Sequence, residues 1–174
     1  PHTYRPMTTK RTNKDLRKRV LDELDWEPSI DSADIGIAVK DGMDITGKDI
    51  NVYDNDLAGN SNFGLYHGGT GLVDASLNWW GANDPAVVAT RISGSDVDYS
   101  PWYASGTDAE PGTPGFQGEL SELWVGPGGS IQEAIDAVVG STVNVAAGTY
   151  DENLSIDKSV TILGPNDELS PNTD

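Results

Sequence analysis

Cysteine is missing from this sequence, and basic residues and long apolar runs are scarce. The absence of cysteine excludes disulfide bonds, thiolate metal sites and cysteine nucleophiles. No stretch approaches the roughly 20 apolar residues that a membrane span needs, so we expect no membrane partner. No signal peptide is visible in the chain.

The few basic residues are unevenly placed. The 174 residues carry a formal net charge of −17, from 11 basic and 28 acidic side chains. Residues 1–48 hold nine of each sign, whereas from Asp49 onward only Arg91 and Lys158 are basic, against nineteen acids. An acidic field repels phosphates, which excludes nucleic acid as a partner. The change in charge indicates two segments of different origin or role.

The composition favours many tight turns around a thin or repetitive core. Hydrophobic residues make up 36% of the chain, and 20 residues are glycine. Glycine, asparagine and aspartate tolerate the left-handed backbone angles that turns require. We therefore predict a mainly β fold with two short helices, over residues 13–24 and 131–139.

The segment before Asp49 reads as a tail followed by half of an α/β unit. Residues 1–12 are polar and basic, and we expect a disordered tail. After the helix over 13–24, alternating apolar residues over 35–39 predict a strand. The Asp41–Gly42 pair predicts a tight turn, with a return strand beginning at Met43.

This segment, DLRKRVLDELDWEPSIDSADIGIAVKDG, resembles the opening of a BON domain. The resemblance implies an αββ start over residues 13–48. The family continues with a second helix and a third strand, where this chain has DINVYDNDLAGNSNFG, so functions such as phospholipid association do not carry over to it. The matching residues are Leu16, Val20, Leu24, Trp26, Pro28, Ile35, Val39, Asp41 and Gly42.

Residues 49–103 change to short apolar pairs separated by Asn, Gly and Asp, a pattern typical of stacked β-coils. In such coils a turn asparagine can hydrogen-bond to the coil above or below. The stretches VDASLNWWGANDP and VDYSPW resemble the end of a right-handed parallel β-helix. The match uses Asp74, Ala75, Asn78, Trp79, Trp80, Gly81, Pro85, Tyr99, Ser100, Pro101 and Trp102.

A Gly/Pro-rich linker over 104–118 leads to a last segment, 119–174. Ser130 and Glu133 form a capping box that begins the helix over 131–139. Strands are predicted over 143–145, 154–156 and 160–163. The block IQEAIDAVVGSTVNVAAGTYDENLSIDKSVTILGPN resembles the N-terminal cap and first coil of a β-helix in the pectin-lyase-like superfamily, whose helix plugs the open end of the cylinder.

The end of a β-helix thus precedes the beginning of one. The chain either crosses the junction of two tandem β-helix domains or pairs its two parts like a circular permutant. The BON-like half indicates a recombined, metagenomic or artificial chimera, and three unrelated fragments that collapse together stay an alternative. Because open coil ends expose unpaired strand edges, we expect a homo-oligomer.

Four aromatic residues are candidates for sugar stacking, because their faces match the apolar faces of pyranose rings. In a strand adjacent side chains point to opposite sides, so only one residue of a neighbouring pair would face outward. The alternative is that the tryptophans seal the end of the cylinder. The candidates are Tyr66, Trp79, Trp80 and Trp102.

The loop DNDLAGN supplies Asp54, Asp56 and Asn60 as candidate ligands for Ca²⁺, which prefers carboxylate and amide oxygens. It departs from a calcium loop further on, where Leu65 replaces the bidentate glutamate. A solvated turn is the alternative, and no other cofactor is expected. His67 lacks the partners of a metal cluster or catalytic triad.

No catalytic residues stand out, and we expect no enzyme. The resemblance to secreted bacterial β-helix proteins implies a structural or glycan- or surface-binding module, secreted or displayed at a cell surface. A fragment of a calcium-assisted polysaccharide lyase and a chimera without evolved function are the alternatives. A lyase base would have to be Arg91 or Lys158, and neither lies in a recognisable lyase motif.

Overall fold

The computed structural model describes residues 38–39, 42–46 and 50–166. The predicted tail, the helix over 13–24, most of the first predicted strand and Asp41 lie outside these residues. Within them the chain is mainly β with two helices, and each of its three sheets contains parallel strands. Of the two helices, only the second was predicted.

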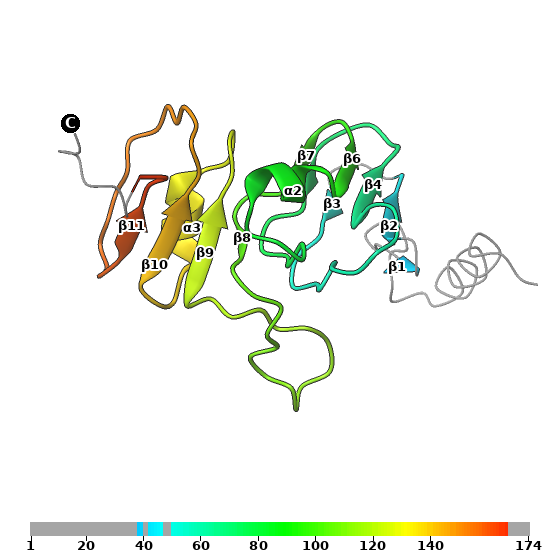
Figure 1. The fold of residues 1–174 in the computed structure, drawn as a ribbon, viewed down its shortest axis with the longest axis horizontal. Coiled ribbons are helices and arrows are strands. Elements are labelled where there is room, and N and C mark those ends of the chain that lie inside the picture. Colours follow the sequence, from blue (N-terminus) through cyan, green and yellow to red (C-terminus); the bar gives the residue numbers. More distant parts are fainter. Residues whose placement is uncertain (1–37, 40–41, 47–49, 167–174) are drawn as a thin grey trace, which may run out of the picture.

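Eleven short strands and two helices follow one another along the described residues (Figure 1). The helices are α2 (Pro85–Ala89) and α3 (Ile131–Ala137). The strands are β1 (Ala38–Val39), β2 (Gly42–Ile45), β3 (Ile50–Asn51), β4 (Leu65–His67), β5 (Val73–Asp74), β6 (Ile92–Gly94), β7 (Val97–Asp98), β8 (Trp102–Tyr103), β9 (Glu122–Val125), β10 (Thr142–Val145) and β11 (Thr161–Leu163).

The first part of the chain forms two stacks of parallel strands. One sheet has the order β1-β2-β4-β6 and another the order β3-β5-β7. Antiparallel pairing of β1 with β2 confirms the predicted strand and return strand where they are described. Since β2 then pairs with β4, the segments separated at Lys48 in the sequence share one sheet.

The parallel pairs repeat at similar spacing along the chain. In the first stack Met43 lies opposite Leu65, and Leu65 lies opposite Ile92. In the second stack the partner positions are 50, 73 and 97. A parallel bridge also joins Asp56 to Trp79. The chain therefore returns to the same place with a period inside the range of roughly 20–50 residues that is typical of stacked repeats.

The last part of the chain forms a third stack, with the order β11-β10-β9-β8. Here Glu122 lies opposite Thr142 and Thr142 opposite Thr161, with all three strands parallel. The remaining pair, β8 with β9, is antiparallel and joins this sheet to the preceding strands. The loop over 104–118 lies between β8 and β9 and projects from the body of the molecule (Figure 1).

Two apolar cores follow one another along the chain. Apolar residues of β3 to β5, Trp80, Val88 of α2 and Trp102 form the first core. Residues of α3, β9 and β10 form the second, in which Leu123 and Val143 are fully buried. Leu77 and Trp79 come from the first part of the chain and pack against the second core, so the two parts share an apolar contact.

An asparagine pair ties adjacent turns of the first part together. Asn78 is completely buried, and its Nδ2 donates to the carbonyls of Val52, Ala75 and Ser76. Its Oδ1 accepts from both the backbone N–H and the side-chain amide of Asn55, at 3.0 Å each. The two asparagines are separated by 23 positions in the sequence, so the pair follows the spacing of the strand stacks.

Helix α3 begins where the sequence predicts, and its N-terminus has an additional cap. Ser130 Oγ accepts from the Glu133 N–H, which is one of the two hydrogen bonds of the predicted capping box. The carboxylate of Glu152, far along the chain, accepts from the amides of Ile131 and Gln132. The helix ends at Ala137 rather than at residue 139, because Val138 is extended and buried in the core.

The strand predictions need one correction. Those over 143–145 and 160–163 are confirmed as β10 and β11 with small shifts at their ends. Residues 154–156 form no strand, and Leu154 and Ile156 are exposed rather than packed. Their alternation therefore has no sheet or core to face. Among the described residues, no helix is long and apolar enough to cross a membrane.

Candidate functional site

Two of the predicted sugar-stacking residues are closed to ligands. Trp80 and Trp102 are both 0% exposed and belong to the first core, where the ring of Tyr99 lies 6.4 Å and 6.3 Å from theirs. A pyranose ring cannot reach a face that is already covered by protein. In this conformation the two side chains offer no surface for stacking, and their burial is consistent with the alternative packing role.

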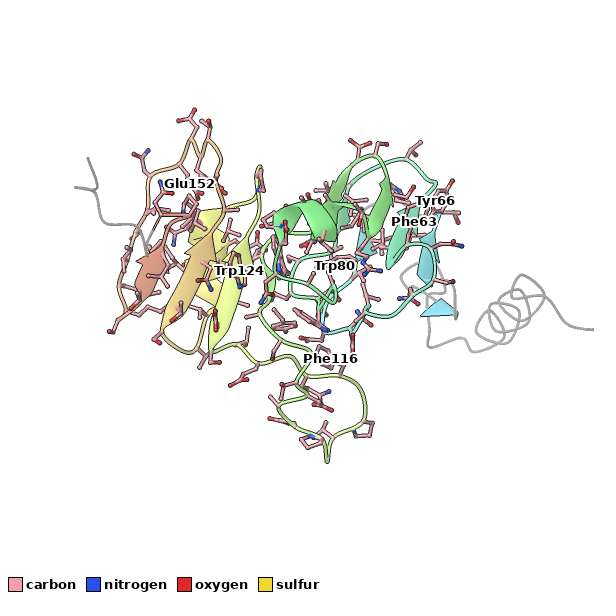
Figure 2. All side chains as sticks on the ribbon, in the orientation of Figure 1. Phe63, Tyr66, Trp80, Phe116, Trp124 and Glu152 are labelled. Carbon is pink, nitrogen blue, oxygen red and sulfur yellow. The ribbon has the colours of Figure 1, made fainter. Side chains whose placement is uncertain are left out.

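The other two aromatic candidates differ from each other. Trp79 is half-buried against the second core and is covered by the chain at Gly106, where a Cβ would lie 2.5 Å from the indole Nε1. Tyr66 is 44% exposed on the outward side of β4. Figure 2 places Tyr66 and Phe63 far from Trp124 along the molecule. The structure does not bring the four predicted aromatics together.

The candidate calcium ligands are engaged in hydrogen bonds within the fold, one of them long-range and two of them local. Asp54 accepts a short hydrogen bond from the Tyr103 hydroxyl. Asp56 Oδ1 accepts from the Ala58 N–H at 2.9 Å, and Asn60 donates to the Leu57 carbonyl. In the part of the chain that the structure describes, no group of three His, Cys, Asp or Glu side chains is placed to hold a metal.

A groove of about 590 Å³ lies between α2 and the outer face of the third stack. This site was not predicted. It is lined mainly by aromatic, proline and small apolar side chains, with two polar residues. The lining residues are Asp84, Pro85, Ala86, Ala89, Tyr99, Trp124, Pro127, Asn144, Val145, Ala146, Ala147, Leu163, Gly164 and Pro165.

Local sequence explains how each wall of the groove forms. Asp84 caps α2 by accepting from the Ala86 N–H at 2.8 Å, and Pro85 occupies the first turn, where no N–H is needed. On the opposite wall, strand alternation turns Leu123 and Val125 into the second core and leaves Trp124 on the other face. Asn144 on β10 lies in register with Trp124.

The polar side chain in the groove wall is held in place. Asn144 is 8% exposed, and its Nδ2 donates to Glu122 Oε1 at 2.7 Å. Trp124 has Trp102 of β8 as its cross-strand partner. The indole N–H of Trp124 is buried and has no hydrogen-bond partner within the described residues. The groove thus combines an aromatic ring with an amide that a hydrogen bond holds in place.

Three carboxylates, of Glu133 on α3 and of Asp74 and Asp98 in the first part of the chain, influence one another electrostatically. Burial raises the pKa of Glu133, and the nearby charges of Asp98 and Asp74 raise it further, against the lowering effect of a hydrogen bond with Ser76. Burial likewise raises the pKa of Asp98, with Asp74 adding to the effect and the Ser100 N–H opposing it. These groups repel one another.

Arg91 and Lys158, the two basic residues from Asp49 onward, differ from each other in their hydrogen bonds. Lys158 Nζ donates at 3.0 Å to the carbonyls of Asp136 and Val138, so it satisfies the C-terminal end of α3. The Arg91 Nε is buried without a partner in the described part of the chain. His67 is buried, and its Nδ1 lies 2.8 Å from the Ser95 carbonyl, a contact within the fold.

No family model, no curated protein and no solved structure matches this chain. The resemblances to β-helix and BON proteins therefore depend on the residues quoted above. The sequence did not predict the groove, although it contains two relevant signals. The pair Asp84–Pro85 is typical of a helix start, and the run Leu123, Trp124, Val125 is typical of a strand with apolar side chains on both faces.

Proposed function

We propose that this chain is a non-catalytic structural module of a secreted or surface-displayed bacterial protein. We propose further that it forms a short right-handed parallel β-helix and binds glycan. The observation that carries this proposal is the similar spacing of the parallel pairs. Partner positions 43, 65 and 92 in one stack, 50, 73 and 97 in the other, and 56 with 79 at the bridge are what a coiled chain of three faces would produce.

The asparagine pair supports the same architecture. In stacked coils, a side chain at a turn has the equivalent residue of the next coil directly above it. Asn55 and Asn78 meet this condition, and Asn78 also donates to the carbonyls of Ala75 and Ser76 in its own turn and of Val52 in the adjacent one. Asn78 is buried and hydrogen-bonded through both its amide nitrogen and its amide oxygen, so a slip in register would leave buried polar groups unpaired.

The last part of the chain is evidence that two such β-helix segments meet in this protein. Its parallel strands β9, β10 and β11 repeat at partner positions 122, 142 and 161, and α3 packs on one face of them. A helix packed with parallel strands agrees with the proposed cap and first coils in its elements, although the resemblance places that helix at the open end of the cylinder. The apolar contact of Leu77 and Trp79 with this core favours two parts packed as one body over fragments without a common core.

A stable rod with an acidic surface suits display and binding rather than chemistry. Lys158 is committed to the end of α3, so it is poorly placed to act as the base of a lyase. The glycan class follows from the resemblance and from the aromatic groove, whose size of about 590 Å³ is within the range of roughly 300–1,000 Å³ for small-ligand sites.

The test is to incubate the full chain with a panel of polysaccharides and to measure both retention and products. We expect slower migration of the protein in gels that contain a bound polysaccharide, with no release of reducing sugar. We also expect no ultraviolet absorbance from unsaturated uronates. Product formation by the purified chain, lost in the Arg91→Ala variant, would replace this proposal with the lyase alternative.

A further inference from the structure

We propose that the groove between α2 and the third stack is a binding site for a neutral saccharide, with a sugar ring stacked on Trp124. The proposal rests on the proposed function only for the class of ligand. The position of the site comes from the structure, because neither Trp124 nor α2 stood out in the sequence.

The apolar part of the groove suits the face of a pyranose ring. Trp124 and Tyr99 provide aromatic surface, and an indole offers the largest such surface of any side chain. Trp124 remains partly exposed, in contrast to Trp80 and Trp102. A ligand can therefore reach the Trp124 ring without unfolding of the protein.

The walls keep the groove open and rigid. Ala86 and Ala89 of α2 are exposed and small, so they leave the groove beside Trp124 and Tyr99 unfilled. Pro85, Pro127 and Pro165 fix the backbone at three places in the lining, since proline has a restricted φ angle. A preformed groove loses little conformational entropy when a ligand enters, which favours binding of a small molecule.

Polar groups border the apolar surface at two places, as a sugar requires. The Asn144 side chain is nine-tenths buried and oriented by Glu122, so its amide can bond a hydroxyl without first being ordered. Asp84 lies on the other wall, where one oxygen caps α2. A carboxylate accepts hydrogen bonds only, and sugar hydroxyls can donate them.

The charge of the surroundings selects against acidic sugars. Asp84 lines the groove, Glu122 holds Asn144, and no basic side chain is among the lining residues. The part of the chain from Asp49 onward also carries the whole net charge of −17. Uronates and sulfated sugars would be repelled, so the ligand that fits is uncharged.

Titration calorimetry on the full chain tests the proposal, with neutral gluco-, xylo- and manno-oligosaccharides and oligogalacturonate as probes. The site is blocked by Ala89→Trp, which fills the groove from α2. The matched control is Val87→Trp on the same helix, because Val87 is 37% exposed and does not line the groove. Thermal unfolding of each variant checks that the fold is kept.

We expect a neutral oligosaccharide to bind and oligogalacturonate not to bind. Ala89→Trp should weaken binding by about tenfold or more, roughly 1.4 kcal/mol, and Val87→Trp should leave it within about twofold. If a neutral sugar binds equally well to Ala89→Trp, the site is elsewhere and this inference is wrong, while glycan binding stands. Loss of that binding in Tyr66→Ala would then locate it on β4.

If neither a neutral sugar nor oligogalacturonate binds, both this inference and the glycan part of the proposed function fail. The scaffold part is judged separately by the spacing of the strands. Preferential binding of oligogalacturonate would also overturn the inference, because it contradicts the charge argument.

Discussion

Asn78 shows how one polar side chain can specify a stacked fold. It has no exposed surface, and it contacts three carbonyls and the two nitrogens of Asn55. A buried amide with these partners stabilises one turn conformation and one spacing between turns. Removing it takes a donor from all three carbonyls and an acceptor from Asn55.

We predict that Asn78→Ala lowers the free energy of unfolding by about 3 kcal/mol, because several buried groups lose their partners at once. The control is Asn83→Ala, which removes one hydrogen bond, to the Ala104 carbonyl, and should cost about 1 kcal/mol. Urea unfolding followed by circular dichroism measures both. Equal losses in the two variants would contradict the role given to Asn78.

The carboxylates of Glu133, Asp74 and Asp98 predict a dependence of stability on pH. The pKa of Glu133 is raised in the folded chain, so folding binds protons at this site and its stabilising effect is lost as pH rises through the folded pKa. Glu133→Gln keeps the shape of the side chain and removes the charge. We expect it to melt higher than the parent chain at neutral pH and to converge with it near about pH 4, the ordinary carboxyl range.

Glu152→Gln is the matched control, with the opposite sign. Slight burial acts to raise the pKa of Glu152, but hydrogen bonds from Ile131, Gln132 and Ser130 outweigh it and lower the pKa. This carboxylate therefore stabilises the fold above the ordinary carboxyl pKa and loses that effect as pH falls. Its variant should melt lower at neutral pH. A pair of variants that shift in the same direction would refute the assignment.

At the scale of elements, local signals predicted what local forces determine. The capping box at Ser130 located α3, and the alternating residues 143–145 and 160–163 located β10 and β11. The strand predicted over 154–156 is wrong, because alternating residues form a strand only where they can pair with a sheet edge and pack against a core. Helix α2 was missed because it is too short to show a helical period in the sequence.

Long-range features lay beyond single-sequence reasoning for a related reason. The sequence predicted stacked coils and turn asparagines, but the register that joins Asn55 to Asn78 depends on how the chain between them folds. The groove likewise depends on α2 and β10 meeting from distant positions in the sequence. Which aromatic residues are accessible to a ligand depends on their burial in the folded chain. Trp79 and Trp80 are neighbours in the sequence, but they have different environments.

The loop over 104–118 separates two parts that we expect to remain associated when it is cut. Residues 109–115 are all exposed, although the Ala109 N–H donates to the Gln117 carbonyl. Within residues 50–166, subtilisin should cut here first. The nicked chain should elute as one particle, held by Leu77 and Trp79 on the second core. Fragments that separate without denaturant would show that the loop, not the packing, joins the parts.

At the scale of the whole molecule, the last part of the chain has exposed apolar side chains and, among the described residues, a sheet edge to which no further strand is paired. Val139 is 81% exposed and Ile156 51%, and Ile162 is 36% exposed on β11, which ends the sheet among the described residues. The Thr161 N–H donates to the Ser141 carbonyl, so the N–H and carbonyl of Ile162 point away from β10. This is an edge to which another strand could add.

The expected homo-oligomer would use this edge, against the repulsion of two acidic chains. We therefore predict that the mass measured by light scattering increases with salt, which screens the charge. Ile162→Lys should suppress the increase, whereas Leu72→Lys, an exposed position in the first part, should not. A monomer at every salt concentration would remove the prediction of an oligomer.

The antiparallel pair of β8 and β9 has a mechanical consequence. Its two residue pairs, Trp102 with Trp124 and Tyr103 with Leu123, adjoin a loop, so the chain enters and leaves the joint at the same end. Tension along the polypeptide would open these pairs one after another, in the unzipping direction. Opening would release residues 104–121, a reserve of roughly 60 Å of extended chain. A protein anchored at both ends would gain this length at the joint once the two pairs and the packing of Leu77 and Trp79 on the second core had opened.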